Sequence, residues 1–332
     1  MIGRAIARRL LAAGWDVELA GRTPARMPRD VTAAGGRFTV ADYHEPDQLK
    51  AAYGAGADLL VDCLCFTAGD ARRVLPFASD AGSAVMLSSK AVYVDSRGRH
   101  VNSAEAPRFD GPIRETQPTM APGDGDHSTR EGYGANKVAA ERVLLDSGAP
   151  VTVIRPSKVH GPGNTGPREW VFVKRVLDRR RAVFLAHRGT GVDHTTAAAN
   201  IASLVELVAA RPGARVLNCA DPDAPSVLEI SRVIGRHLGH QWEEMLMDDG
   251  TLGRTPWDAI PPVTLDMTAA AGLGYVPAGD YAATVAEAID WLVDAHRAGD
   301  PGQMLPRPGD SYFTRFLDYA AEDRWLARGL AG

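Results

Sequence analysis

A tyrosine and a lysine four positions apart, Tyr133 and Lys137, open an alanine-rich stretch whose apolar spacing predicts a helix. Four residues span about one helical turn, so the phenol and the ammonium are expected on one face. An ammonium beside a phenol favours the phenolate and lowers the phenol's pKa from about 10. Tyr133 is then able to give or take a proton at a substrate hydroxyl or carbonyl. The alternative is a chance pair on a solvated helix, since the chain has eight tyrosines and five lysines.

A serine hydroxyl that suits the same substrate oxygen lies at the end of an apolar run, within the stretch Leu87–Tyr93. The run predicts a strand, and Ser88 and Ser89 follow its last apolar residue directly. We expect Ser89 to bind the oxygen on which Tyr133 acts. The alternative for both serines is a plain turn at the end of a strand.

Strands and helices alternate through the first half of the chain. Expected strands span residues 17–20, 37–40, 57–64, 84–87 and 151–154, and expected helices span residues 1–14, 47–53, 68–77 and 132–147. This alternation predicts a parallel sheet covered by helices on both faces. Ligands of such sheets bind beyond the carboxyl ends of the strands. Four candidate residues fall at those ends: Arg22, Asp42, Phe66 and Ser89.

The connections lengthen after residue 155. A turn-rich loop spans residues 161–167, helices are expected at 170–180, 197–210 and 225–238, and a strand is expected at 215–219. Residues 300–309 carry the proline and glycine pattern of a hinge. The apolar spacing of residues 313–326 predicts an amphipathic tail helix that docks onto this chain or onto a second subunit.

The composition is that of an ordinary soluble globular protein, with 332 residues, 45% hydrophobic residues and a net charge of -4. The acidic balance argues against nucleic acid, and neither a membrane span nor a signal peptide is visible. Three cysteines, Cys63, Cys65 and Cys219, suit packing in a reducing cytoplasm better than disulfides or a metal site. We therefore expect a cytoplasmic protein that acts on a small molecule.

Five sequence motifs follow one another in the order and spacing of a known family. They are Met1-Ile2-Gly3, Ser88-Ser89-Lys90-Ala91-Val92-Tyr93, Tyr133 to Lys137, Arg155-Pro156-Ser157-Lys158-Val159-His160-Gly161-Pro162-Gly163, and Leu265-Asp266-Met267-Thr268 with Leu273-Gly274-Tyr275-Val276-Pro277. The chain resembles the extended short-chain dehydrogenase/reductase family, in its NAD-dependent epimerase/dehydratase group, from residue 1 to about residue 295. Residues 61–67 are similar to the atypical branch, which contains non-enzymes.

The resemblance implies an α/β fold, a Rossmann-type doubly wound parallel sheet with a smaller C-terminal substrate-binding region. Residues 1–155 would form the dinucleotide-binding domain, and residues 187–222 would return to it. Residues 156–186 and 223–299 would form the substrate-binding region, and residues 300–332 the hinge and the tail helix. The family also implies a homodimer, formed through the helices that include Tyr133 and Lys137.

The resemblance assigns roles to the candidate residues. Tyr133 is the acid/base, Lys137 lowers its pKa and holds the nicotinamide ribose, and Ser89 polarises the substrate oxygen. The expected substrate contacts are Asn164, Arg168, Trp170 and His194. For three of these the alternative is structural: a helix start at Arg168, a core anchor at Trp170 and a hydrogen-bonded histidine at His194.

The chain departs from the family at its start, where the family has a strand followed by three glycines that let the pyrophosphate approach the backbone. Only the last of those glycines is present, as Gly3, and the first strand is missing. Two explanations compete. Either the native chain carries about ten more residues upstream, or it has lost ordinary cofactor binding, and we expect the first because the downstream catalytic residues are present.

The residue after the second expected strand reads the cofactor's adenosine ribose. An acidic residue there would bind the 2′-hydroxyl, whereas Arg22 suits a 2′-phosphate, so we expect NADP in preference to NAD, with NAD as the alternative. The resemblance places Asp42 at the adenine. The expected cofactor-binding residues are Gly3, Arg22, Asp42, Phe66, Lys137, Pro156, Ser157 and Val159.

Two functions from different classes fit these residues. The first is an NAD(P)-dependent oxidoreductase or epimerase that transfers a hydride at a hydroxyl or carbonyl carbon of a small molecule, such as a sugar nucleotide or a secondary metabolite. A dehydratase is disfavoured, because Lys90-Ala91 replaces the Asp-Glu pair that such enzymes use. The rival is a cofactor-free binding or regulatory protein on a degenerate Rossmann fold, which the incomplete glycine loop favours.

Overall fold

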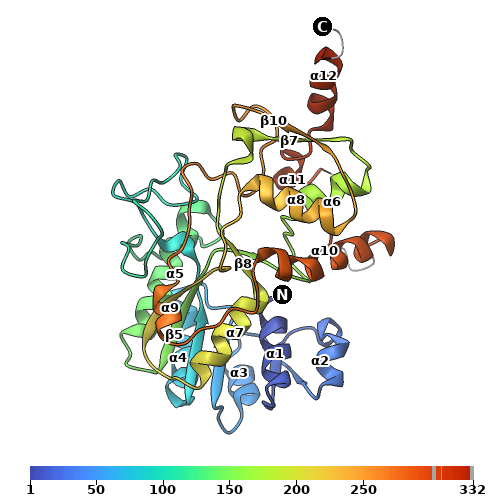
Figure 1. Ribbon diagram of the computed structural model, residues 1–332. Coiled ribbons are helices and arrows are strands. Elements are labelled where there is room, and N and C mark those ends of the chain that lie inside the picture. Colours follow the sequence, from blue (N-terminus) through green and yellow to red (C-terminus); the bar gives the residue numbers. More distant parts are fainter. Residues whose placement is uncertain (301–303, 308, 330–332) are drawn as a thin grey trace.

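A parallel four-stranded sheet forms the centre of the N-terminal half, in a computed structural model that describes residues 1–300, 304–307 and 309–329 (Figure 1). The strand order is β3 (Leu59–Asp62), β4 (Ser83–Leu87), β5 (Val151–Pro156) and β9 (Arg215–Cys219). All neighbouring strands are parallel. The two central strands, β4 and β5, are buried along their whole length, as continuous apolar runs predict.

Helices cover both faces of this sheet, as the sequence predicts. α1 (Ile2–Ala12) and α7 (Ala198–Ala209) pack on the face that carries Val85 and Leu87, while α4 (Ala68–Asp80) and α5 (Arg130–Leu145) pack on the face that carries Met86. Successive residues of β4 therefore enter different hydrophobic clusters, because side chains alternate along a strand. The doubly wound α/β architecture is confirmed.

The strands at the start of the chain form a separate parallel pair, β1 (Glu18–Gly21) with β2 (Arg37–Val40). Helix α1 joins this pair to the main sheet, since Leu19 of β1 and Val61 of β3 pack against the cluster that contains Ile6. The expectation that a first strand is missing stays a prediction. The remaining elements of this half are η1 (Pro24–Arg26), α2 (Arg29–Ala33), α3 (Pro46–Tyr53) and η2 (Lys90–Val92).

The C-terminal half surrounds its own hydrophobic cluster, which includes Trp170, Phe172, Trp257 and Ile289. Its helices are α6 (Trp170–Leu177), α8 (Val227–His237) and α10 (Tyr281–Arg297), with η3 at Ala186–Gly189, whereas Ala270 of α9 (Thr268–Gly272) packs in the cluster that contains Ile6. Two short parallel strand pairs complete it: β6 (Lys158–His160) with β8 (Thr195–Ala197), and β7 (Ala182–Leu185) with β10 (Glu243–Leu246). Strands β6, β7, β8 and β10 and helices α9 and α10 were not predicted from the sequence.

The tail contains two helices where one was expected, α11 (Ser311–Thr314) and α12 (Tyr319–Gly329). Each begins at its own aspartate: Asp310 accepts from the Tyr312 N–H at 2.9 Å, and Asp318 accepts from the Ala321 N–H at 3.0 Å. Phe313 and Phe316 enter the C-terminal cluster, so the tail docks onto this chain. Residues 301–303 and 308 of the expected hinge lie outside the described residues.

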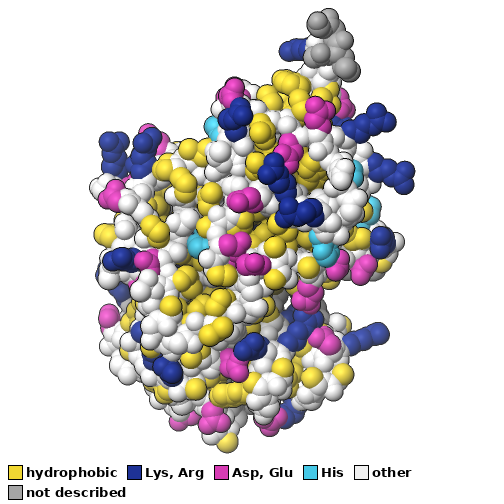
Figure 2. All heavy atoms as spheres, viewed as in Figure 1, with side chains coloured by type: hydrophobic (Ala, Val, Ile, Leu, Met, Phe, Trp, Pro, Cys, Tyr) yellow, Lys and Arg dark blue, Asp and Glu magenta, His cyan; other side chains and the backbone are white. Residues whose placement is uncertain are grey.

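The surface carries lysine and arginine side chains interspersed with aspartate and glutamate over the face in Figure 2. In the described part of the chain, no helix is long and apolar enough to cross a membrane. The three cysteines are free thiols, and burial raises the pKa of Cys63 to about 12. Residues 1–300, 304–307 and 309–329 contain no group of three histidine, cysteine or acidic side chains that could hold a metal ion.

Candidate active site

Tyr133 and Ser89 come together because helix α5 approaches the end of β4 very closely. The approach requires Gly134, since a Cβ there would lie 2.6 Å from the Ala91 carbonyl oxygen and 2.5 Å from the Met120 sulfur. Only glycine lets the helix pass at this distance. Thr129 fixes the start of α5, because its Oγ1 accepts from the Gly132 N–H at 3.0 Å. The expected serine and tyrosine therefore meet.

Tyr133 is half-buried, and its phenol lies beside the half-buried Ser89 hydroxyl. Burial raises the pKa of the Tyr133 phenol, and the neighbouring Ser89 hydroxyl offsets part of that rise. The Ser89 Oγ also accepts from the Ala91 N–H at 3.2 Å, which holds it at the start of η2. The phenol is therefore protonated at neutral pH.

The contacts of Lys137 differ from those expected of a residue that lowers the pKa of Tyr133. Its Nζ donates to the carbonyls of Cys65 at 2.8 Å and Leu87 at 2.9 Å, where β3 and β4 end. Only 2% of Lys137 is exposed, and burial lowers its own pKa. Because the ammonium is directed to two backbone oxygens, it does not offset the effect of burial on the phenol.

Phe66 forms an aromatic wall of the site. The centroid of its ring lies 4.2 Å from the Lys137 Nζ and 6.4 Å from the centroid of the Tyr133 ring. The same ring stacks on His127 at 5.5 Å, a residue that the sequence analysis missed. The sequence around His127 carried no motif that pointed to the site.

The edge expected to hold the dinucleotide begins at the start of α1. The N–H groups of Ile2 and Gly3 have no partner among the described residues, so they are free donors at a helix N-terminus, which suits a phosphate. A Cβ at Gly3 would lie 3.7 Å from the Cys63 sulfur, an ordinary contact. This donor set fits one phosphate of a dinucleotide.

Arg22 and Asp42 follow β1 and β2 at the carboxyl edge. Arg22 is exposed, and no described residue pairs with its guanidinium. Asp42 organises its own turn, because its carboxylate accepts from the His44 N–H at 2.9 Å and its N–H donates to Gln48 at 2.8 Å. Arg22 is thus open to a ligand, while Asp42 is partly engaged.

The segment after β5 joins the main sheet to β8. Pro156 ends β5, the Ser157 N–H donates to the Thr196 hydroxyl at 3.0 Å, and the Ser157 hydroxyl donates to the His194 carbonyl. Val159 lies opposite Thr196 in the β6–β8 pair. These contacts fix the backbone of the expected nicotinamide pocket.

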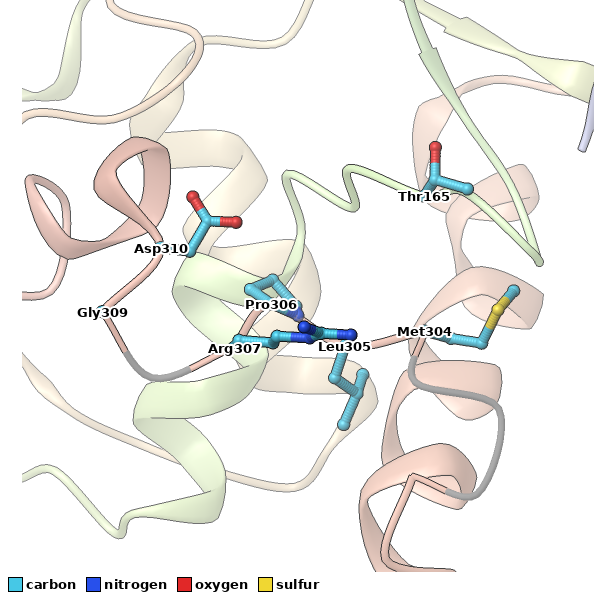
Figure 3. Close-up of a pocket in the computed structure, with 7 residues that line it drawn as sticks. All are labelled: Thr165, Met304, Leu305, Pro306, Arg307, Gly309 and Asp310. Carbon is cyan, nitrogen blue, oxygen red and sulfur yellow. The ribbon is translucent and has the colours of Figure 1, made fainter.

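Asn164 and Arg168 hold the loop at residues 161–167 against β6. Both donate to the Val159 carbonyl, Asn164 at 3.3 Å and Arg168 at 3.2 Å. Thr165 of this loop borders a pocket of ≈ 420 Å³, shown in Figure 3, together with tail residues. The other lining residues are Met304, Leu305, Pro306, Arg307, Gly309 and Asp310. The loop therefore faces open space on the side of the tail.

Two of the expected substrate-binding residues, Trp170 and His194, make contacts that stabilise the fold. Trp170 begins α6 and is 4% exposed within the C-terminal hydrophobic cluster. His194 donates from Nε2 to the Asp221 carbonyl at 2.9 Å, and its Nδ1 accepts from the Leu265 N–H at 3.0 Å. Both ring nitrogens are thus committed to the backbone. The packing favours the core anchor at Trp170 and the hydrogen-bonded histidine at His194 over substrate contact.

A buried ion pair beneath the site was also missed. Arg155 Nε donates to Glu141 at 3.0 Å, and the Ser88 hydroxyl donates to the same carboxylate. This bond removes Ser88 from the catalytic candidates, in agreement with the choice of Ser89. Glu141 stands one helical turn after Lys137, and that spacing was a signal that could have placed it on the buried face.

Comparisons with known proteins found solved structures of the same fold and a matching family model. Solved structures with the same fold include UDP-glucose 4-epimerase from Thermus thermophilus with NAD, at 16% identity and a TM-score of 0.64, covering 89% of this chain and 96% of that one. dTDP-glucose 4,6-dehydratase from Bacillus anthracis with NAD has 13% identity and a TM-score of 0.67, covering 90% and 94%. UDP-glucuronic acid 4-epimerase from Bacillus cereus has 15% identity and a TM-score of 0.61, covering 88% and 96%.

No curated protein matches the chain. The model of the NAD dependent epimerase/dehydratase family matches residues 1–219, about two thirds of the chain. The expected resemblance is thereby confirmed, and the chain is an enzyme of the extended short-chain dehydrogenase/reductase type. The protein belongs to the NAD-dependent epimerase/dehydratase family.

Proposed function

We propose that the protein is an NAD(P)-dependent oxidoreductase or epimerase that acts at a hydroxyl or carbonyl carbon of a sugar nucleotide or a related small molecule. The observation that carries the proposal is the half-buried Ser89–Tyr133 pair, with the Lys137 ammonium fixed on the backbone carbonyls of Cys65 and Leu87. Family membership and NAD-bound neighbours that act on sugar nucleotides support it.

The residues divide the reaction between them. When bound, the nicotinamide supplies or accepts the hydride. Tyr133, which is protonated at neutral pH, donates its proton to a carbonyl oxygen during reduction and takes one from a hydroxyl during oxidation. Ser89 holds the same oxygen by a hydrogen bond. Lys137 would hold the nicotinamide ribose through its ammonium, which now bonds the Cys65 and Leu87 carbonyls.

An epimerase or reductase fits better than a dehydratase. Elimination of water needs an acid and a base beside the reacting oxygen, in addition to the tyrosine. Lys90 follows Ser89 directly and is paired with Asp193. Burial lowers the pKa of Lys90 well below its usual value, and its carboxylate partner is shared with Lys158. No free acidic pair therefore stands next to Ser89 among the described residues.

The choice of dinucleotide is a finer part of the proposal. Exposed Arg22 at the end of β1 suits the 2′-phosphate of NADP. The family description and the NAD-bound neighbours favour NAD instead. The preference for NADP therefore stays a prediction, as do the homodimer and the cytoplasmic location.

The test compares the wild type with Tyr133→Phe in hydride transfer and epimerisation, using a panel of UDP- and dTDP-sugars with either dinucleotide. Loss of the phenolic proton should lower kcat by about 10²- to 10⁴-fold without abolishing dinucleotide binding. Tyr53→Phe is the matched control, because its hydroxyl bonds exposed Asp80 far from the site. Equal turnover in Tyr133→Phe and the wild type would refute the role of Tyr133. A wild type that binds no dinucleotide would favour the cofactor-free rival.

A further inference from the structure

Two lysines, one buried and one half-buried, share one carboxylate next to the candidate active site. Lys158 Nζ lies 3.1 Å from one oxygen of Asp193, and Lys90 Nζ contacts the other oxygen. Lys90 is 4% exposed and Asp193 is 7% exposed. The side chain of Lys158 is 23% exposed, so it is the member of the group that reaches solvent.

This group holds more cationic side chains than carboxylates. Arg168 and Arg315 are close enough to Lys158 to reinforce the effect of burial, and together they lower the pKa of Lys158 to about 7. Among the described residues, Asp193 is the one carboxylate paired with any of these four cations. Arg168 donates to the Val159 carbonyl, and its buried Nε has no partner.

The cationic side chains around Asp193 differ in their exposure to solvent. Lys90 contacts Asp193 on the enclosed side, and Lys158 contacts the other oxygen of the same carboxylate from the more exposed side. Lys158 and Arg168 flank the loop at residues 161–167 in the chain, Arg168 has no carboxylate partner among the described residues, and Thr165 of the loop borders the pocket of Figure 3. An anion bound here would balance the charge of these partly buried cations.

We propose that Lys158 and Arg168 bind a carboxylate or phosphate group that the substrate carries close to its reacting carbon, with Asp193 as a positioning residue that holds Lys158. The inference rests on the proposed function, because Tyr133 and Ser89 define the reacting carbon. Lys90 follows Ser89 in the chain, which places the group near the reacting oxygen rather than at a distant diphosphate. The substrate class is thus an acidic sugar or hydroxy compound.

The test measures binding to the full chain, with no turnover, for two pairs of ligands that differ in one anionic group. UDP-glucuronic acid is compared with UDP-glucose for a carboxylate, and glucose 6-phosphate with glucose for a phosphate. In the wild type, the acidic member of at least one pair should bind about 10- to 100-fold more tightly. Its binding should also take up protons from the buffer in calorimetry, because an anion restores the charge of Lys158.

Variants separate this subsite from a general effect of charge. Lys158→Met and Arg168→Gln should remove the discrimination and the proton uptake, whereas Lys158→Arg should keep the discrimination. Lys50→Met, on the exposed side of α3, is the matched control and should behave as the wild type.

Three results would overturn the inference: no discrimination in the wild type, discrimination that survives in Lys158→Met, or an equal loss for UDP-glucose and UDP-glucuronic acid. The last result would assign the lysine to the diphosphate. Failure of the proposed function is seen separately, as a wild type that binds neither NADH nor NADPH.

Discussion

The close approach of α5 to the end of β4 predicts that Gly134→Ala impairs catalysis more than folding. The new Cβ would lie 2.6 Å from the Ala91 carbonyl oxygen and 2.5 Å from the Met120 sulfur. The methionine can rotate away, but the carbonyl belongs to the backbone of η2. The helix and η2 must therefore separate by about 0.4 Å or more, which displaces Tyr133 from Ser89.

The two consequences of this change differ in size. Misplacement of a catalytic group by about 1 Å costs about 10²-fold, so a shift of a few tenths of an ångström should lower kcat/KM by about 10-fold or more. Overpacking costs about 1–3 kcal/mol in unfolding free energy, and alanine recovers about 1 kcal/mol through its helix propensity. The net loss of stability should be about 0–2 kcal/mol.

The assay combines urea unfolding with steady-state kinetics on an active sugar nucleotide. Gly272→Ala is the control, because a Cβ at that helical glycine meets no atom within 4 Å. It should leave kcat/KM unchanged and should not destabilise the fold. The reasoning would be refuted if Gly134→Ala matched Gly272→Ala in both measurements.

Three further predictions follow from single contacts. Glu141→Gln should lower the unfolding free energy by about 3–5 kcal/mol, because it leaves the buried Arg155 guanidinium unpaired. Its control, Glu244→Gln, removes an exposed pair with Arg232 and should lower the unfolding free energy by about 0–1 kcal/mol. Equal urea midpoints for the two variants would contradict this prediction. Arg22→Ala should weaken NADPH binding by about 10-fold and leave NADH binding unchanged; an unchanged ratio of the two dissociation constants would remove Arg22 from the cofactor site. Because burial raises the pKa of Tyr133 above its usual value of about 10, the rate of carbonyl reduction should be constant through neutral pH and fall only above about pH 10. A fall in the rate below pH 8 that disappears in Tyr133→Phe would show that the pKa of Tyr133 is lowered instead.

The sheet was largely predictable from the sequence because its central strands are short apolar runs that match local rules. Residues 37–40 were placed without error as β2, and residues 84–87 and 151–154 lie within β4 and β5. Helix α10 carried a usable signal that was overlooked, since Val285, Ala288, Ile289 and Leu292 follow a helical period after the capping Asp280. Strands β6 and β8 have three residues each and depend on pairing between distant segments, so local patterns could not reveal them.

The candidate site was predictable as a set of residues but not as a set of contacts. Tyr133 and Ser89 meet, as their positions after a helix start and a strand end indicate. The partners of Lys137 are backbone carbonyls, which no residue pattern encodes. Lys90 and Asp193 are paired across widely separated parts of the sequence, so spacing could not connect them. Burial, which reverses the expected shift in the pKa of Tyr133, is a property of the packed fold.

Dinucleotide binding to the 332-residue chain tests the central claim most directly, with NADPH and NADH titrated separately by fluorescence or calorimetry. A family enzyme with free N–H groups at the start of α1 and an intact Ser89, Tyr133 and Lys137 site should bind at least one of them at micromolar concentration. Absence of binding to both, by a chain whose urea unfolding is cooperative, would contradict the oxidoreductase or epimerase assignment.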